Sequence, residues 1–148
     1  MPSTYTSLHY HIVFSTKDRE PWIDRSCRPR VHEYLGGTIH GLGGVPEAIG
    51  GTADHVHLLI GLKSTHCLAD FVREVKKASS VWVHEELRRS RFAWQEGYAA
   101  FTVSATARES VREYIVHQEE HHRGKTFREE LTAMLDKAGI EYDPRYVE

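Results

Sequence analysis

Hydrophobic and polar side chains alternate along residues 7–15, the first strongly patterned segment of the chain. Large apolar side chains occupy every second position there, at Leu8, Tyr10, Ile12 and Phe14. Successive side chains of a strand point to opposite faces, so the pattern predicts a strand with one apolar face. We predict two further strands at residues 45–50 and 55–62, joined by the tight segment 51–54, and a fourth at 98–103.

Apolar residues at helical spacing fill the stretches between these strands. One stripe consists of Val31, Tyr34, Leu35, Ile39 and Leu42, and a second runs from residue 68 to about residue 87. We predict one continuous helix over residues 108–122, and a last short helix that begins at the capping-box pattern 126–129 and ends at Gly139.

The predicted order of elements is βαββαβ followed by helices. This order is typical of the ferredoxin-like α+β fold, a four-stranded antiparallel sheet with two helices on one face. A further helix at the C-terminal side and a short terminal helix complete it. We expect one domain over residues 1–148, with a core at about 7–122 and a helical tail at 123–148. RNA-recognition modules share this fold, so the fold alone does not decide function.

Composition narrows the class of protein. The chain is 40% hydrophobic and 27% charged, as in ordinary globular proteins, and we expect neither a membrane span nor a signal peptide. Cys27 and Cys67 form no CxxC motif, which favours reduced thiols in a cytoplasmic protein. A net charge of -2 does not indicate nucleic-acid binding, so such binding requires local basic faces and a metal ion. The chain contains no GxxxxGK[ST] loop, and we expect no nucleotide cofactor.

Two histidines on one strand are the first candidate metal ligands. His55 and His57 alternate with apolar residues, so they share one face of the predicted strand. They are either two arms of a divalent-metal site or polar residues on an exposed sheet face. Since the chain has 11 histidines, the pair alone carries little weight. The preceding Asp54 is predicted as a turn residue, with a capping role or orientation of an imidazole as the alternatives.

The predicted helix 108–122 supplies residues that complete such a site. Tyr114, Gln118 and His121 stand at i, i+4 and i+7, within roughly 60° of one another around the helix. A third ligand from this helix, Gln118 or His121, would leave coordination positions open for water or substrate. Tyr114 is then a candidate nucleophile, provided the helix lies over the histidine-bearing face.

Five motifs together resemble the IS200/IS605-type single-tyrosine transposases and their REP-associated relatives. They occur in the same order as in that family, from about Leu8 to His122, and occupy residues 10–17, 53–60, 76–80, 97–104 and 114–118. The central motif is Ala-Asp-His-Val-His-Leu-Leu-Ile at residues 53–60.

The resemblance implies a DNA transposase that cleaves and rejoins single-stranded DNA near a hairpin at the element's ends. In the family, residues matching His55, His57 and Gln118 bind Mg²⁺ or Mn²⁺; His121 stays open as an alternative third ligand. The residue matching Tyr114 attacks a phosphodiester, which leaves a 5'-phosphotyrosine bond and a free 3'-hydroxyl. The resemblance also suggests a homodimer, although REP-associated relatives can be monomers.

Basic residues are the candidates for DNA phosphate contact, with a merely solvated surface as the alternative. They are Lys17, Arg19, Lys76, Lys77, Arg88, Arg89 and Arg91. Three rival functions remain open: a non-catalytic nucleic-acid-binding module, a hydrolase whose metal activates water, and a domesticated relative that nicks host repeats.

Overall fold

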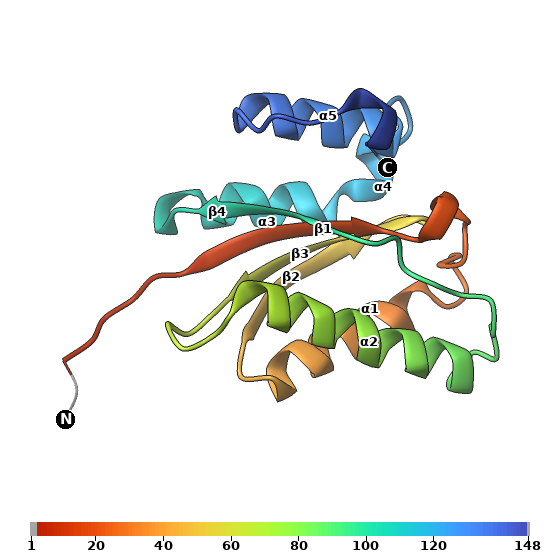
Figure 1. Cartoon of the computed structure of the whole chain (residues 1–148), viewed down its shortest axis with the longest axis horizontal. Helices are drawn as coiled ribbons and strands as arrows, with labels where there is room; N and C mark the ends of the chain where they lie inside the picture. The colour runs from red at the N-terminus through yellow and green to blue at the C-terminus, as the bar shows by residue number, and fades with distance from the viewer. Residues whose placement is uncertain (1–2, 148) are drawn as a thin grey trace.

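A computed structural model of the chain describes residues 3–147. Its four strands form one antiparallel sheet in the order β2-β3-β1-β4 (Figure 1). The strands are β1 (His9–Ser15), β2 (Val45–Gly51), β3 (His55–Gly61) and β4 (Ala99–Val103). With helices α1 (Arg28–Gly41) and α2 (Leu68–Glu86) between them, this arrangement confirms the predicted ferredoxin-like α+β fold.

Helices cover both faces of the sheet. Figure 1 shows α1 and α2 on one face, and α3 (Arg108–Val116), α4 (Gln118–His121) and α5 (Phe127–Lys137) stacked over the other. Among residues 3–147, the 3₁₀ turns η1 (Lys17–Arg19) and η2 (Ala105–Ala107) connect neighbouring elements, and a third, η3 (Pro144–Tyr146), follows α5. No helix among residues 3–147 has the length and hydropathy needed to cross a bilayer.

The side-chain alternation of β3 divides the molecule into two layers. Val56, Leu58 and Ile60 are buried in the main apolar core, which contains the inward faces of α1 and α2. His55 and His57 therefore point to the opposite face, where α3, α4 and α5 lie. Both imidazoles are nevertheless fully buried, which indicates that these helices close over them.

A glycine in β2 lets α3 approach the sheet closely. Gly50 pairs across the sheet with His57, and a Cβ built at Gly50 would overlap the backbone carbonyl of Ile115. Ile115 is fully buried against Leu59 and its neighbours. The missing side chain thus lets the backbone of α3 lie directly on β2, beside the strand that carries His55 and His57.

The predicted continuous helix 108–122 is wrong at one point, because the chain breaks at His117. His117 has φ -105° and ψ 26°, outside the α-helical range, and its Nδ1 contacts the carbonyl oxygen of Glu113 at 2.7 Å. In a continuous helix that oxygen would accept the backbone N–H of His117. The break separates α3 from α4 and changes which later side chains face the sheet.

Candidate active site

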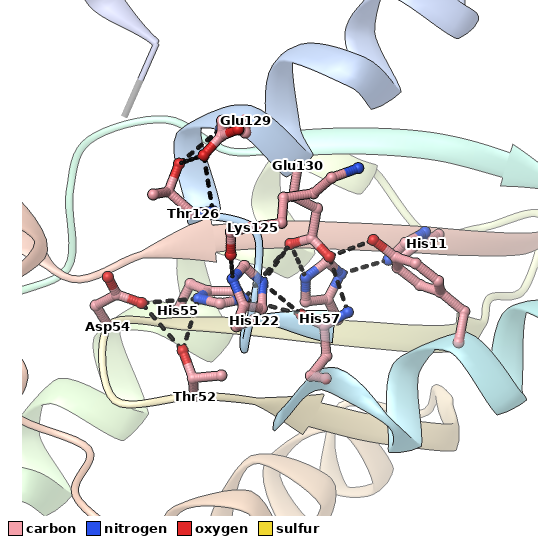
Figure 2. A network of polar contacts seen from close by, with 12 residues as sticks. His11, Thr52, Asp54, His55, His57, His122, Lys125, Thr126, Glu129 and Glu130 are labelled. Carbon is pink, nitrogen blue, oxygen red and sulfur yellow. Dashed lines mark hydrogen bonds and ion pairs between the residues drawn. The ribbon is translucent and has the colours of Figure 1, made fainter. Parts of the chain in front are cut away.

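Both β3 histidines are held by polar partners on the ring nitrogen that faces away from the site. His55 Nδ1 lies 2.8 Å from Asp54 Oδ1, and Thr52 donates to the same carboxylate oxygen at 3.2 Å. His57 Nδ1 lies 2.8 Å from His11 Nε2 on β1. These contacts fix both rings and turn each Nε2 toward a common point (Figure 2). Asp54 thus lies in the connecting turn and also contacts an imidazole, so both interpretations of this residue hold.

The helices after β4 bring two predicted residues to this point. Gln118 is buried, with its Oε1 3.0 Å from His55 Nε2. The half-buried Tyr114 lies with its ring centroid 5.9 Å from that of His57. The structure therefore meets the condition set from the sequence, since the tyrosine helix lies over the histidine-bearing face.

Glu130 of α5 is a site residue that the sequence reading missed. Its carboxylate accepts hydrogen bonds from His57 Nε2 at 2.9 Å and His122 Nε2 at 3.0 Å (Figure 2). It also accepts hydrogen bonds from Gln118 Nε2 at 2.9 Å and from the hydroxyl of Tyr114. Its position in the sequence could have indicated this role, because Glu130 interrupts an apolar stripe. The stripe is formed by Phe127, Leu131, Met134 and Leu135.

His122, which follows α4, reaches the site, whereas the neighbouring His121 in α4 does not. His121, the alternative third ligand, is exposed and stacks on the Tyr114 ring with centroids 4.6 Å apart. His122 instead places its Nε2 3.1 Å from Gln118 Oε1, while its Nδ1 donates to the Lys125 carbonyl at 2.7 Å. The helix break at His117 explains why His122 lies beside Gln118 in place of His121. The prediction placed these residues around one continuous helix, and the break changes their directions.

The charges of the site follow from burial and from the Glu130 carboxylate. Burial lowers the pKa of His57 to about 4, against the opposing effect of Glu130, and burial with the nearby His57 lowers the pKa of His11 to about 3. For His122, burial acts to lower the pKa, but the hydrogen bond and charge of Glu130 outweigh it and raise the pKa. At neutral pH, His57 and His11 are therefore neutral.

Tyr114 and Glu130 are shifted in opposite directions. Burial and the adjacent carboxylate raise the pKa of the Tyr114 phenol well above its usual range. Burial acts to raise the pKa of Glu130, but hydrogen bonds from His122 and His57 lower it overall, so the carboxylate is ionised. The phenol is thus protonated at neutral pH in the cation-free protein.

The donor set fits a divalent cation. If the Nδ1–H of a neutral His55 donates its hydrogen bond to Asp54, the Nε2 lone pair of that ring faces the Gln118 oxygen at 3.0 Å. Two acceptors at this separation repel each other unless a cation or a proton lies between them. Ligating atoms of His55, His122 and Glu130 also lie within 4.8 Å of one another. Imidazole, amide and carboxylate donors suit Mn²⁺, Mg²⁺ and Zn²⁺.

Two of the predicted phosphate-binding residues lie near the site. Arg19 borders an open cleft of about 580 Å³ that also includes Asp54 and His122, and Lys17 is exposed on the same 3₁₀ turn. Arg123 and Lys125 also line the cleft, although they are not among the phosphate-binding residues predicted from the sequence.

The other predicted phosphate-binding residues lie on or after α2, beyond the sheet from the histidines. Lys76 donates to the carbonyls of Gln95 and Gly97 at 2.6 and 2.8 Å, and Arg89 pairs with Asp24 at 3.1 Å. These contacts give Lys76 and Arg89 roles in holding the loop before β4 and the segment before α1. Exposed side chains remain at Lys77, Arg88 and Arg91.

Sequence comparison decides the family. The sequence model described as "Transposase IS200 like" matches residues 4–118, most of the chain. The chain belongs to the family of IS200-like transposases. Membership in this family implies nuclease and strand-transferase activity. The matched stretch ends at Gln118, so His122 and Glu130 lie outside it.

Solved structures agree with this assignment. The chain is similar to a candidate transposase from Deinococcus radiodurans R1, with 26% identity and a TM-score of 0.65 over 78% of this chain and 93% of that one. It also shares its fold with a REP-associated tyrosine transposase bound to a REP hairpin, with 12% identity and a TM-score of 0.56 over 78% and 68% of the two chains. A comparison with curated proteins gives no match.

Proposed function

We propose that this IS200-like transposase cleaves and rejoins single-stranded DNA through a covalent bond to Tyr114. One observation carries the proposal: the Tyr114 hydroxyl and the imidazole of His57 bind the same carboxylate, Glu130. The nucleophile and the candidate cation ligands therefore lie side by side. This arrangement is what covalent catalysis assisted by a metal requires.

In the proposed reaction, the Tyr114 oxygen attacks the phosphorus of a phosphodiester. The new bond is a 5'-phosphotyrosine, the bond from phosphorus to the 3' oxygen breaks, the phenol proton is lost, and the departing 3' oxygen takes up a proton. One ester replaces another, so the bond energy is kept for rejoining and no nucleotide cofactor is needed.

We propose that His55, His57 and Gln118 hold Mg²⁺ or Mn²⁺ at this site. A bound divalent cation supplies positive charge that polarises the scissile phosphate and stabilises charge on its oxygens. The chain's own contribution is rigidity: Asp54 and His11 fix the two imidazoles, and the close contact of α3 with Gly50 fixes Tyr114 above them. Preorganised groups of this kind reduce the cost of reaching the transition state.

The proposed partner is single-stranded DNA that carries a hairpin. The REP-associated neighbour is bound to a REP hairpin, and the cleft at Arg19, Arg123 and Lys125 offers positive charge beside the histidines. A homodimer is also part of the proposal, with a monomer as the alternative. Light scattering at several protein concentrations distinguishes the two, because a dimer has twice the mass of the 17.0 kDa chain.

The test is a covalent-adduct assay with labelled single-stranded oligonucleotides from the flanks of the gene. With Mn²⁺ we expect a protein–DNA band on a denaturing gel, which EDTA abolishes. Tyr114→Phe should lose the band and keep DNA binding. Tyr34→Phe is the matched control, because Tyr34 stacks on Trp82 beyond the sheet and should retain the adduct.

Two outcomes of that assay contradict the proposal. Cleavage without an adduct that survives Tyr114→Phe would identify a hydrolase whose metal activates water. DNA binding without cleavage or adduct, with every flank and both metals, would identify a non-catalytic binding module.

A further inference from the structure

We infer that Glu130 is an additional ligand of the active-site cation, so that α5 belongs to the metal centre. The inference rests on the function proposed above, and it deepens it with a residue outside the stretch matched by the family. The argument comes from the positions of the two carboxylate oxygens, the burial of Glu130 and the attachment of α5.

The first carboxylate oxygen lies among the imidazole nitrogens. Glu130 Oε1 is 2.9 Å from His57 Nε2, 3.6 Å from His55 Nε2 and 3.0 Å from His122 Nε2. For ligands about 2.1 Å from a cation, neighbouring ligand atoms are about 3.0 Å apart in an octahedron and about 3.4 Å apart in a tetrahedron. The observed distances therefore have the lengths expected for edges of a coordination polyhedron.

The second carboxylate oxygen connects this point to the nucleophile. Glu130 Oε2 accepts the hydroxyl of Tyr114, and it accepts Gln118 Nε2 at 2.9 Å. The latter bond orients the Gln118 amide so that its Oε1 faces His55. Glu130 thus holds the phenol beside the cation's ligands and positions the amide ligand as well.

The burial of Glu130 requires positive charge nearby. Its side chain is only 2% exposed, and its ion-pair partners among the described residues are all histidines. An ionised carboxylate removed from water is costly without a compensating charge. Without a bound cation, His122 supplies this charge, because it donates through both ring nitrogens, to the Lys125 carbonyl and to Glu130. No lysine or arginine side chain among residues 3–147 forms an ion pair with this carboxylate, and a divalent cation among the same imidazoles would add the remaining positive charge.

Helix α5 is attached firmly enough to deliver a ligand. Thr126 caps its first turn in a complete capping box with Glu129. The buried ring of Phe127 lies against His55 with centroids 4.4 Å apart, and Leu131 packs with Val13 of β1. One side of the helix therefore contacts the metal-ligand strand itself, which places Glu130 reproducibly.

Calorimetric Mn²⁺ titration of the full-length protein without DNA tests the inference. We expect Glu130→Gln, which keeps the side-chain shape, to weaken Mn²⁺ binding at least about tenfold, and Glu130→Asp to restore part of it. Glu120→Gln is the matched control, because Glu120 is exposed and its side chain has no hydrogen-bond or ion-pair partner among the described residues. That variant should bind as the wild type does. His57→Ala should lose binding and serves as the reference for a broken metal centre.

The outcomes separate this inference from the proposed function. If His57→Ala loses Mn²⁺ binding while Glu130→Gln binds Mn²⁺ as tightly as the wild type or more tightly, Glu130 is not a ligand. Its carboxylate then only occupies the site until the cation displaces it, and the inference is overturned. If the wild type binds no Mn²⁺, the metal centre of the proposed function fails too. A wild-type crystal soaked in Mn²⁺ gives a check independent of variant folding: the anomalous peak should lie about 2.2 Å from Glu130 Oε1. A peak with no contact to that oxygen contradicts the inference.

Discussion

The contact between Gly50 and α3 predicts that one added methyl group will disturb both stability and catalysis. In Gly50→Ala, the new Cβ would overlap the carbonyl oxygen of Ile115 and come within 2.8 Å of its carbonyl carbon. Both neighbours are backbone atoms, so no side-chain rotation can relieve the clash. The helix itself must move away from the sheet.

The size of the movement follows from ordinary contact distances. Non-bonded carbon atoms prefer a separation of about 3.5 Å, so α3 must shift by roughly 0.7 Å to restore the carbon contact, and further for the oxygen. Overpacking of this kind costs about 1–3 kcal/mol of unfolding free energy. Tyr114 is the residue before Ile115, and a displacement near 1 Å at a reacting group can slow a reaction about a hundredfold.

Urea denaturation and the adduct assay measure the two effects. Gly37→Ala is the matched control, because a Cβ at this exposed position of α1 meets no described atom within 4 Å apart from the adjacent backbone of α1 itself. It should be stabilised by up to about 1 kcal/mol, with adduct formation unchanged. If Gly50→Ala is as stable and as fast as the wild type, the close contact does not position Tyr114, and the reasoning is refuted.

Two further predictions concern pH and the imidazole partners. Burial, with the charge of Arg28 adding to it, lowers the pKa of His32 to about 4, so the unfolded chain binds a proton below about pH 6.5 that the folded protein does not. Stability should therefore fall as the pH drops from about 6.5 to 4, by on the order of 2 kcal/mol from this residue. In His32→Gln, the free energy of unfolding, measured by urea denaturation, should fall less between pH 7 and pH 4.5 than in the wild type. An equal fall in both proteins would contradict the prediction. Asp54→Asn should weaken Mn²⁺ binding about 10- to 100-fold by calorimetry, because the Asp54–His55 contact loses its charge. Unchanged affinity would leave Asp54 with its turn role alone.

The sheet and its histidines were predictable because strand periodicity is local. In β3 the alternation of imidazoles with Val56, Leu58 and Ile60 already assigns each side chain to a face, and the structure confirms the strand and both helices that cover its apolar side. The motif order from β1 to Gln118 likewise points to the family that the sequence model confirms.

The rest of the site depends on tertiary contacts that no local pattern specifies. Because the helix breaks at His117, His122 lies beside Gln118, whereas His121 stacks on Tyr114. Helical periodicity predicts side-chain directions only for an unbroken helix. The placement of α5 over the histidines is also non-local. Its only trace in the sequence is Glu130 within an apolar stripe, which is equally compatible with a partly exposed helix.

Peptide mapping of the trapped protein–DNA adduct tests the central claim most directly. After Mn²⁺-dependent reaction with single-stranded DNA, nuclease digestion and proteolysis, mass spectrometry locates the residue that carries the nucleotide. We predict a 5'-linked nucleotide on the peptide that contains Tyr114, and none in samples treated with EDTA. A nucleotide attached to any other residue would contradict the proposed site, as would a cleaved strand with no attached peptide.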